Sequence, residues 1–257
     1  MNNIFACTGR VALVTGSSGD IGAGIATALA DNGADIVVHY VASKSRAEAV
    51  ASDIRDRGRR AIALGADLRD PKAVTTMIEN ASRELGPIDI VINNAGVRRK
   101  TGDHKYILEV TDEEWDVELD SHLKAAFLVC KAALPSMIER RWGRIINISS
   151  VVAKSGGVGA SVHYPAAKGG IISFTKALAT QIAKNGITAN VLSPGIIDTE
   201  RVRWRSPAQM QEHIDKIPVG RLGQVAEIAA AAVYLSSEPA AYVTGATLEI
   251  NGGLYMA

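Results

Sequence analysis

Short apolar runs alternate with longer amphipathic stretches along this chain. Most of these runs are continuously apolar, as expected for parallel strands that are covered on both faces. The runs of strand length begin at Val11, Asp35, Ala61, Ile88, Arg144, Thr188 and Thr247. Because strand and helix alternate about six times with short connections, the pattern predicts an α/β fold, a doubly wound parallel sheet with helices on both faces.

Two of the predicted helices have clear start signals. Asp70 followed by Pro71 predicts an N-cap with proline in the first turn, and Gly86 is expected to close that helix. Thr111 and Glu114 have the spacing of a capping box at the start of another helix.

Composition narrows the classes of protein. The chain has 257 residues with 47% hydrophobic content and shows no repeat or low-complexity linker, which predicts one domain over residues 1–257. Its net charge of +1 and its 5% aromatic content disfavour nucleic acid or an anionic membrane as partners. No apolar run approaches the ~18 residues of a membrane span, and the first residues lack a signal-peptide layout. Cys7 and Cys130 match no metal spacing, so we expect reduced thiols in a cytoplasmic protein without a metal site.

Candidate chemistry is expected at the carboxyl ends of the strands, where ligands bind in folds of this class. The first apolar run is followed by TGSSGDIG, residues 15–22, which has the small residues of a phosphate-binding turn. Gly16 permits a tight turn, and Gly22 allows close packing of the next helix. Amides and hydroxyls for a phosphate are offered by Ser17, Ser18 and Gly19. A purely structural turn can have the same composition.

The other strand ends also carry small or polar residues. Asp67 could accept a hydrogen bond from an adenine amino group, or cap a turn. The stretch NNAG at residues 93–96 lets the backbone pass close to a ribose or to a neighbouring strand. Pro194 and Gly195 turn the chain ahead of Thr199, which could donate to a carboxamide or a phosphate.

Tyr164 and Lys168 lie four residues apart, so on a helix they share one face. A phenol titrates near ~10, and an adjacent ammonium lowers its pKa. Tyr164 could then exchange a proton with an alcohol or carbonyl oxygen, while Ser150 holds the same oxygen. A tyrosine and a lysine with this spacing usually form an exposed pair on a helix. Here the serine at the end of a strand and the nucleotide-binding turn favour a catalytic role.

These motifs, in this order, resemble those of the short-chain dehydrogenase/reductase family, from Thr15 to Asn251. The chain is most similar to the 3-oxoacyl-acyl-carrier-protein reductases of that family. The resemblance implies a Rossmann-type fold, with a cofactor half over about 8–150 and a catalytic and substrate half over about 151–257. It implies hydride transfer between a nicotinamide and a carbonyl or secondary alcohol. Tyr164 becomes the catalytic acid/base, Lys168 lowers its pKa and binds the nicotinamide ribose, and Ser150 orients the substrate oxygen.

The cofactor is expected to be NADP(H) rather than NAD(H). Enzymes that prefer NAD usually place an acid at the end of the second strand, where this chain has Tyr40. Ser43, Lys44 and Arg46 follow and could hold a 2′-phosphate, although an N-cap with solvated basic residues has the same sequence. The predicted cofactor-binding residues are Gly16, Ser17, Ser18, Gly19, Ile21, Gly22, Tyr40, Ser43, Lys44, Arg46, Asp67, Leu68, Asn94, Ala95, Gly96, Tyr164, Lys168, Pro194, Gly195, Ile197 and Thr199.

Two positions depart from the family's pattern. Asp20 replaces a residue that is usually not acidic, and we expect it to point away from the pyrophosphate and to cap the helix. His122 stands where the family usually has an asparagine that helps to hold a proton-relaying water. His122 is therefore a fourth candidate catalytic residue; a histidine packed between helices without a relay role is the alternative.

The expected substrate depends on the loops after the fourth and sixth apolar runs. Clustered basic residues could attract an anionic substrate or an acidic carrier protein, or form a solvated loop. They are Arg98, Arg99, Arg201, Arg203 and Arg205, and Trp204 lies between the last two. A small-molecule carbonyl or alcohol is expected, with an acyl-carrier-protein-linked 3-oxoacyl thioester as the leading substrate. A sugar, polyol or other secondary-alcohol dehydrogenase and a catalytically silent NADP-binding regulatory protein are the alternatives. The family implies a homotetramer or homodimer.

Overall fold

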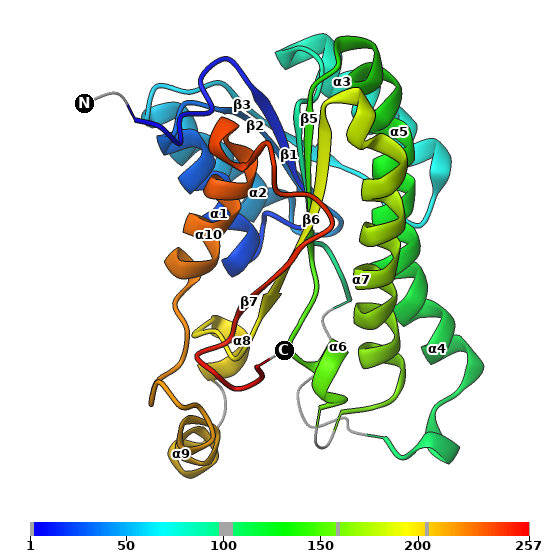
Figure 1. The fold of residues 1–257 in the computed structure, drawn as a ribbon, viewed down its shortest axis with the longest axis vertical. Helices are drawn as coiled ribbons and strands as arrows, with labels where there is room; N and C mark the ends of the chain where they lie inside the picture. The colour runs from blue at the N-terminus through cyan, green and yellow to red at the C-terminus, as the bar shows by residue number, and fades with distance from the viewer. Residues whose placement is uncertain (1–2, 98–104, 158–159, 204–205, 257) are drawn as a thin grey trace.

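The computed structural model describes residues 3–97, 105–157, 160–203 and 206–256, apart from the side chain of Arg201. One seven-stranded sheet runs through the molecule in the order β3-β2-β1-β4-β5-β6-β7, and all neighbouring strands are parallel (Figure 1). The strands are β1 (Val11–Val14), β2 (Asp35–Tyr40), β3 (Ala61–Gly65), β4 (Ile90–Asn93), β5 (Gly143–Ile148), β6 (Ile187–Pro194) and β7 (Thr247–Ile250). The predicted doubly wound α/β fold is confirmed.

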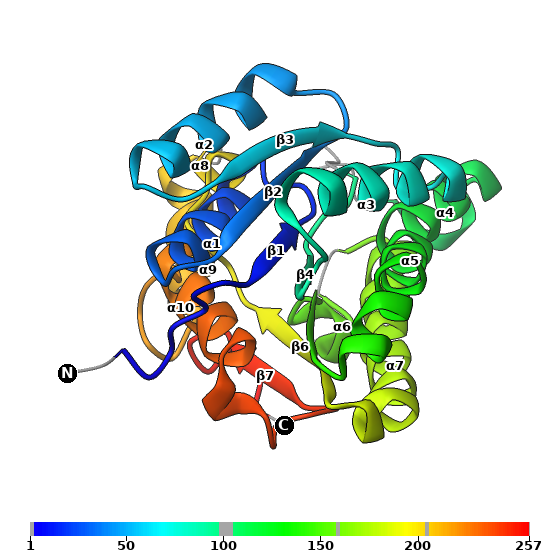
Figure 2. The ribbon, with the colours of Figure 1, turned by 90° about the horizontal axis from the view of Figure 1, so that it is seen from above.

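Helices cover both faces of the sheet (Figure 2). One face is covered by α1 (Asp20–Asp31), α2 (Lys44–Asp56) and α10 (Val225–Ser236). The other is covered by α3 (Pro71–Leu85), α5 (Ala125–Arg140) and α7 (His163–Ile182). The shorter helices are α4 (Asp112–Leu119), α6 (Val152–Ser155), α8 (Glu200–Arg203) and α9 (Pro207–Asp215), and 3₁₀ turns cover Ile107–Glu109, Ala183–Asn185 and Glu238–Ala240.

Both predicted helix starts are confirmed. The Asp70 side chain accepts a hydrogen bond from the amide of Lys72, and Pro71 opens α3. The Thr111 hydroxyl accepts from the amide of Glu114, whose carboxylate accepts in return from the Thr111 amide. Each cap satisfies amides that the first helical turn leaves without an intrahelical partner.

The strand order reverses beside β1, which pairs with both β2 and β4. Val14, the last residue of β1, is in register with Val38 on one side and Ile92 on the other. The segments that follow β1 and β4 therefore leave the sheet side by side. This is the switch point at which ligands bind in doubly wound sheets.

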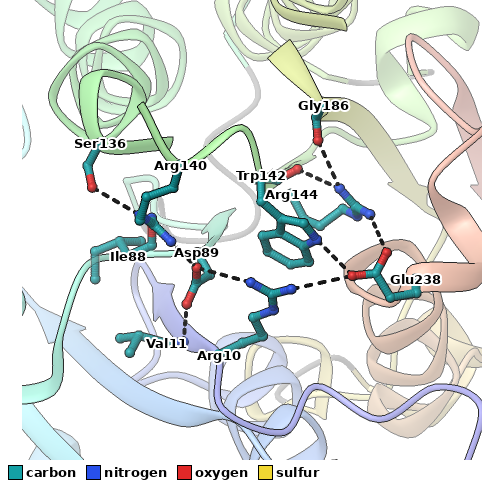
Figure 3. Close-up of polar contacts among 11 residues, drawn as sticks. Arg10, Val11, Ile88, Asp89, Ser136, Arg140, Trp142, Arg144, Gly186 and Glu238 are labelled. Carbon is teal, nitrogen blue, oxygen red and sulfur yellow. Dashed lines mark hydrogen bonds and ion pairs between the residues drawn. The ribbon is translucent and has the colours of Figure 1, made fainter. Parts of the chain in front are cut away.

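A charged cluster around Trp142 lies at the amino ends of the strands (Figure 3). The guanidinium of Arg10 lies 3.5 Å from the Trp142 ring centroid, and that of Arg144 lies 4.4 Å from it. The indole Nε1 donates to Glu238 at 2.8 Å, and Glu238 also pairs with both arginines at 3.4 Å. The cluster ties the chain after α10 to the starts of β1 and β5, at the end of the strands opposite to the switch point.

Candidate active site

A cleft of about 700 Å³ lies at the carboxyl edge of the sheet and collects most of the predicted site. Its walls come from the segments that follow β1, β2, β3, β4, β5 and β6 and from α7. The predicted residues that line it are Gly16, Ser18, Gly19, Ile21, Gly22, Ser43, Arg46, Asp67, Leu68, Asn94, Ala95, Gly96, His122, Ser150, Tyr164, Lys168, Pro194, Gly195, Ile197 and Thr199. Residues from six strand ends thus meet in one cavity.

Three predicted cofactor residues do not line the cleft. Ser17 is fully buried, and its hydroxyl donates to the carbonyl of Val14 at 2.7 Å and accepts from the amide of His39 at 3.0 Å. Tyr40 lies with its ring against Gly65, where an added Cβ would be 2.9 Å from the ring. Lys44 is exposed at the start of α2. The Ser17 hydroxyl therefore joins β1 to β2 and is not offered to a phosphate.

The glycine-rich turn, residues 15–22, depends on the absence of side chains. Gly16 has φ +66°, and a Cβ there would lie 2.9 Å from the Cα of Ala95. A Cβ on Gly22 would lie 2.6 Å from the carbonyl oxygen of Gly16. The Thr15 hydroxyl accepts from the amides of Asn94 and Ala95 at 2.9 and 3.0 Å, which ties the turn to the segment after β4. An open backbone at the start of α1 fits the pyrophosphate of a dinucleotide.

His39, which was not among the predicted site residues, supports this turn. Its Nδ1 accepts from the amide of Gly16 at 3.0 Å, and its Nε2 lies 3.0 Å from the carbonyl of Ala66. Burial lowers the pKa of His39, so a neutral ring with its proton on Nε2 satisfies both contacts. The histidine that directly follows the apolar residues 36–38 was the available signal.

Asp20 does not cap α1 as expected. Gly19 is the N-cap, and the Asp20 carboxylate accepts a hydrogen bond at 3.0 Å from the amide of Glu200, the first residue of α8. Arg46 of α2 also reaches this helix, since its guanidinium lies 3.0 Å from the Glu200 carboxylate. The two contacts join the turn after β1 and the start of α2 to the segment after β6.

The Asp67 carboxylate, predicted to meet an adenine amino group, is paired with Arg69. Two nitrogens of the Arg69 guanidinium donate to it at 3.0 and 2.6 Å. These hydrogen bonds lower the pKa of Asp67 to about 2. Asp67 therefore lines the cleft as an anion whose charge is largely countered.

Ser150, Tyr164 and Lys168 meet in the cleft. Ser150 follows β5, and the other two lie one turn apart in the first half of α7. The buried Lys168 ammonium donates to the carbonyl of Ile148 at 2.9 Å and lies 5.8 Å from the Tyr164 ring centroid. The Ser149 hydroxyl donates to the backbone carbonyl of Lys168 at 2.8 Å, which fixes α7 against the end of β5. The arrangement places a hydroxyl, a phenol and an ammonium around one cavity.

His122 also lies in this cleft, on a π-helical turn over Asp120–Lys124 between α4 and α5. Its ring centroid is 5.5 Å from that of Tyr164, in an edge-to-face arrangement. Its Nε2 lies 3.0 Å from a carboxylate oxygen of Glu118, one turn earlier in the chain. Glu118 was not among the predicted site residues.

The basic residues expected to meet the substrate are only partly described. Arg98, Arg99, Trp204 and Arg205, and the side chain of Arg201, lie outside the described residues. Arg203 is paired with Asp198 at 2.9 Å.

Among the helices that the structure describes, none is long and apolar enough to cross a membrane.

Known proteins match this chain over nearly its full length. Residues 16–255 match the family model described as enoyl-(acyl carrier protein) reductase. Over 248 residues the chain is 39% identical to the 3-oxoacyl-[acyl-carrier-protein] reductase of Haemophilus influenzae, covering 96% of this chain and 99% of the relative. The reductase of the same description from Escherichia coli strain K12 is 40% identical, with 96% and 98% covered.

Solved structures give the same result for the fold. A putative gluconate dehydrogenase from Agrobacterium tumefaciens superposes with a TM-score of 0.93 at 30% identity, covering 100% of both chains. A blue fluorescent protein from a metagenomic library, in complex with NADPH, superposes with a TM-score of 0.89 at 37% identity, covering 97% of this chain and 99% of that one.

Proposed function

Because this chain belongs to the short-chain dehydrogenase/reductase family and is an oxidoreductase, we propose that it reduces 3-oxoacyl thioesters with NADPH. The observation that carries the proposal is the joint presence of two features. The chain is about two-fifths identical, over nearly its whole length, to reductases described as acting on 3-oxoacyl-[acyl-carrier-protein]. Its cleft also holds Ser150, Tyr164 and Lys168 together.

In the proposed reaction, the substrate carbonyl oxygen lies between the Ser150 hydroxyl and the Tyr164 phenol. When bound, the reduced nicotinamide supplies a hydride to the carbonyl carbon. Tyr164 gives its proton to the oxygen as general acid, and Ser150 orients that oxygen through a hydrogen bond. The Lys168 ammonium, 5.8 Å from the phenol ring, stabilises the phenolate that remains. The same side chains act in reverse when an alcohol is oxidised.

The residues that line the cleft support binding of a dinucleotide. The residues at and after the end of β2 support NADP(H) over NAD(H). The glycine-rich turn leaves room for a pyrophosphate at the start of α1. β2 ends at Tyr40 without the acid that grips a ribose 2′-hydroxyl in many NAD enzymes. Arg46 and Ser43 line the cleft nearby, where a guanidinium and a hydroxyl can hold a 2′-phosphate.

We propose a homotetramer or homodimer in the cytoplasm, acting on a substrate linked to an acyl-carrier protein. The long helix α5, which packs beside α7, exposes apolar surface that a second copy would cover. Phe127 is 44% exposed and packs edge-to-face on Phe174 at 6.4 Å, and Ile138 is 41% exposed. Both cysteines are free and buried, which fits a reducing compartment.

A sugar or polyol dehydrogenase is the second candidate. It is favoured by the superposition with the putative gluconate dehydrogenase, which covers both chains completely. That relative is less similar in sequence than the 3-oxoacyl-[acyl-carrier-protein] reductases.

The test is NADPH oxidation over 3-oxoacyl thioesters, keto sugars and simple ketones, with Tyr164→Phe as the matched inactive variant. We expect the highest kcat/KM with a 3-oxoacyl thioester. Tyr164→Phe should lower kcat by ~10²–10⁴ while NADPH still binds. A higher kcat/KM with a keto sugar would replace the first candidate by the second. Full turnover by Tyr164→Phe would overturn the proposed mechanism.

A further inference from the structure

A buried histidine lies behind the glycine-rich turn of the cleft. His39 is fully buried on β2, the strand between β1 and β3. Its Nδ1 lies 3.0 Å from the amide nitrogen of Gly16, after β1, and its Nε2 lies 3.0 Å from the carbonyl oxygen of Ala66, after β3. Gly16 and Asp67, the residue after Ala66, both line the cleft. One side chain therefore joins two segments that form the wall of the proposed dinucleotide site.

These two contacts define where the proton of the ring lies. The Gly16 amide can only donate a hydrogen bond, and the Ala66 carbonyl can only accept one. A neutral imidazole with its proton on Nε2 satisfies both groups. An imidazolium carries a proton on each nitrogen, so its Nδ1–H would face the N–H of Gly16 and that hydrogen bond would be lost. Protonation of His39 is therefore incompatible with the observed position of Gly16.

The backbone of His39 makes a separate set of contacts. Its amide donates to the Ser17 hydroxyl at 3.0 Å, and its carbonyl accepts from the Ser17 amide at 3.1 Å. These backbone contacts can form with any side chain at position 39. The Gly16 amide, in contrast, has the ring nitrogen as its acceptor. Substitution of the ring thus tests the position of Gly16 without removing the contacts of the β2 backbone.

The surroundings of the ring keep it neutral at neutral pH. The ionisable residues on the described segments around it are Asp20 in the turn, Tyr40 on β2, and Asp67, Arg69, Asp70 and Lys72 after β3. Burial, the largest effect, lowers the pKa of His39 from its ordinary value of 6.5. Asp67 acts in the opposite direction, but its carboxylate is paired with Arg69 at 2.6 Å. The carboxylates of Asp20 and Asp70 each accept from a backbone amide.

We propose that His39 is a positioning residue of the dinucleotide site, whose Nδ1 holds the Gly16 amide and so fixes the turn that meets the pyrophosphate at the start of α1. The inference rests on the dinucleotide binding proposed above and not on the identity of the substrate. Because the pKa of His39 in the folded protein lies below 6.5, the contact is complete at neutral pH and is lost as the pH falls through that lower value. Dinucleotide affinity should therefore fall in acid.

Calorimetric titration with NAD⁺ between pH 8 and pH 5 tests the proposal. NAD⁺ is the probe because it has no 2′-phosphate, whose own ionisation near pH ~6 would add a second pH dependence. We expect the wild-type Kd to be constant near pH 7.5 and to rise in acid, by at most about tenfold per pH unit.

Two variants separate the acceptor from the rest of the ring. His39→Asn places an amide oxygen near the position of Nδ1 and cannot be protonated, so its Kd should stay within about threefold of wild type at pH 7.5 and remain constant in acid. His39→Leu removes the acceptor at similar size, so its Kd should be about tenfold higher at every pH. His213→Asn is the matched control and should keep the wild-type profile, because His213 lies on α9 and does not line the cleft.

Equal Kd values for His39→Asn and His39→Leu would overturn the proposal, because the acceptor would then make no difference. If a variant does not fold, the wild-type profile decides. A Kd that stays constant or falls with decreasing pH, down to the pH of unfolding, would show that the neutral ring is not required. A rise in acid that persists in His39→Asn would assign the pH dependence to another group.

These measurements do not depend on turnover, so they are independent of the reaction tested with Tyr164→Phe. Wild-type protein that binds neither NAD⁺ nor NADP⁺ at any pH would contradict the dinucleotide site itself, and the proposed function and this inference would both fall. Binding that is normal in wild type and unaffected by His39→Leu would overturn this inference alone.

Discussion

Arg46, one of three residues predicted to hold a 2′-phosphate, forms an ion pair with Glu200 at 3.0 Å. The pair joins α2 to α8 across 154 positions of the chain, and both side chains are more than half exposed. A bound 2′-phosphate would compete with Glu200 for the same guanidinium. Because an exposed pair contributes only ~0–1 kcal/mol, a dianionic phosphate is expected to win that competition.

Arg46→Ala is therefore expected to weaken NADPH binding roughly tenfold, as loss of a charged hydrogen bond does, and to leave NADH binding nearly unchanged. Glu200→Gln should strengthen NADPH binding by up to about fivefold, since the exposed pair no longer competes. Kd values for both cofactors, measured by nicotinamide fluorescence, check both variants. Lys44→Ala is the control, because Lys44 is exposed on the same helix and does not line the cleft. Equal effects of Arg46→Ala on the two cofactors would show that NADP preference does not depend on Arg46.

Asp20 gives a second prediction for the cofactor. The Asp20 carboxylate accepts a hydrogen bond from the Glu200 amide, which partly compensates its negative charge. At ~6 Å in mostly aqueous surroundings its repulsion of a phosphate would be on the order of 1 kcal/mol. We therefore expect Asp20→Gly to change the NADPH Kd by less than tenfold in a direct binding titration. A much larger gain in affinity would mean that the acid opposes the phosphates.

The fold was predictable because its signals are local. Mostly apolar runs such as VALVT and IDIVIN mark strands buried on both faces, and the caps at Asp70 and Thr111 mark helix starts. Parallel strands place their carboxyl ends at one edge, so the polar residues after each run had to approach one another. The convergence of Ser150, Tyr164 and Lys168 on the cleft follows from this topology.

The contacts that escaped prediction depend on side-chain direction or on distant parts of the chain. Ser17 lies in the glycine-rich turn, yet its hydroxyl points inward to Val14 and His39. The contact between Glu118 and His122 involves a π-helical turn, which no residue pattern in the sequence indicated. Arg46 and Glu200 are brought together only by the packing of the complete fold.

Gly96→Ala is expected to be tolerated well only when the His122 side chain is shortened too. The three atoms nearest to a Cβ at position 96 all belong to the His122 imidazole, the closest at 1.8 Å. Gly96→Ala must displace that ring, which should cost about 1–3 kcal/mol of unfolding free energy and lower kcat. The shorter side chain of His122→Asn removes the clash, so the double variant should regain most of the stability. Denaturant titrations of the four proteins measure the coupling, and additive losses would contradict the packing described here.

The two thiols are expected to be unreactive in the native protein. Burial raises the pKa of Cys7 to about 11 and that of Cys130 to about 12, so few molecules carry a thiolate at pH 8. Alkylation by iodoacetamide, followed by mass spectrometry, should leave both native thiols unmodified and label both after unfolding in guanidinium chloride. Rapid labelling of either cysteine in the folded protein would show that its segment opens readily.

Asp89 is expected to stabilise the fold without contributing to activity. It is buried at the amino edge of the sheet, where it accepts from the Val11 amide at 2.9 Å and from Arg140, and lies 3.6 Å from Arg10 (Figure 3). Asp89→Asn removes the charge that both arginines face, so the free energy of unfolding should fall by about 1–3 kcal/mol.

Asp31→Asn is the matched control for this prediction, because Asp31 pairs with Arg57 at 3.0 Å on the surface. It should lower the unfolding free energy by no more than ~1 kcal/mol. Urea titrations give both values, and kcat/KM per folded molecule should stay at the wild-type level in each variant, because the strands separate Asp89 from the cleft. A loss of kcat/KM in Asp89→Asn at full folding would mean that the amino edge of the sheet is coupled to the catalytic residues at the other end of the strands.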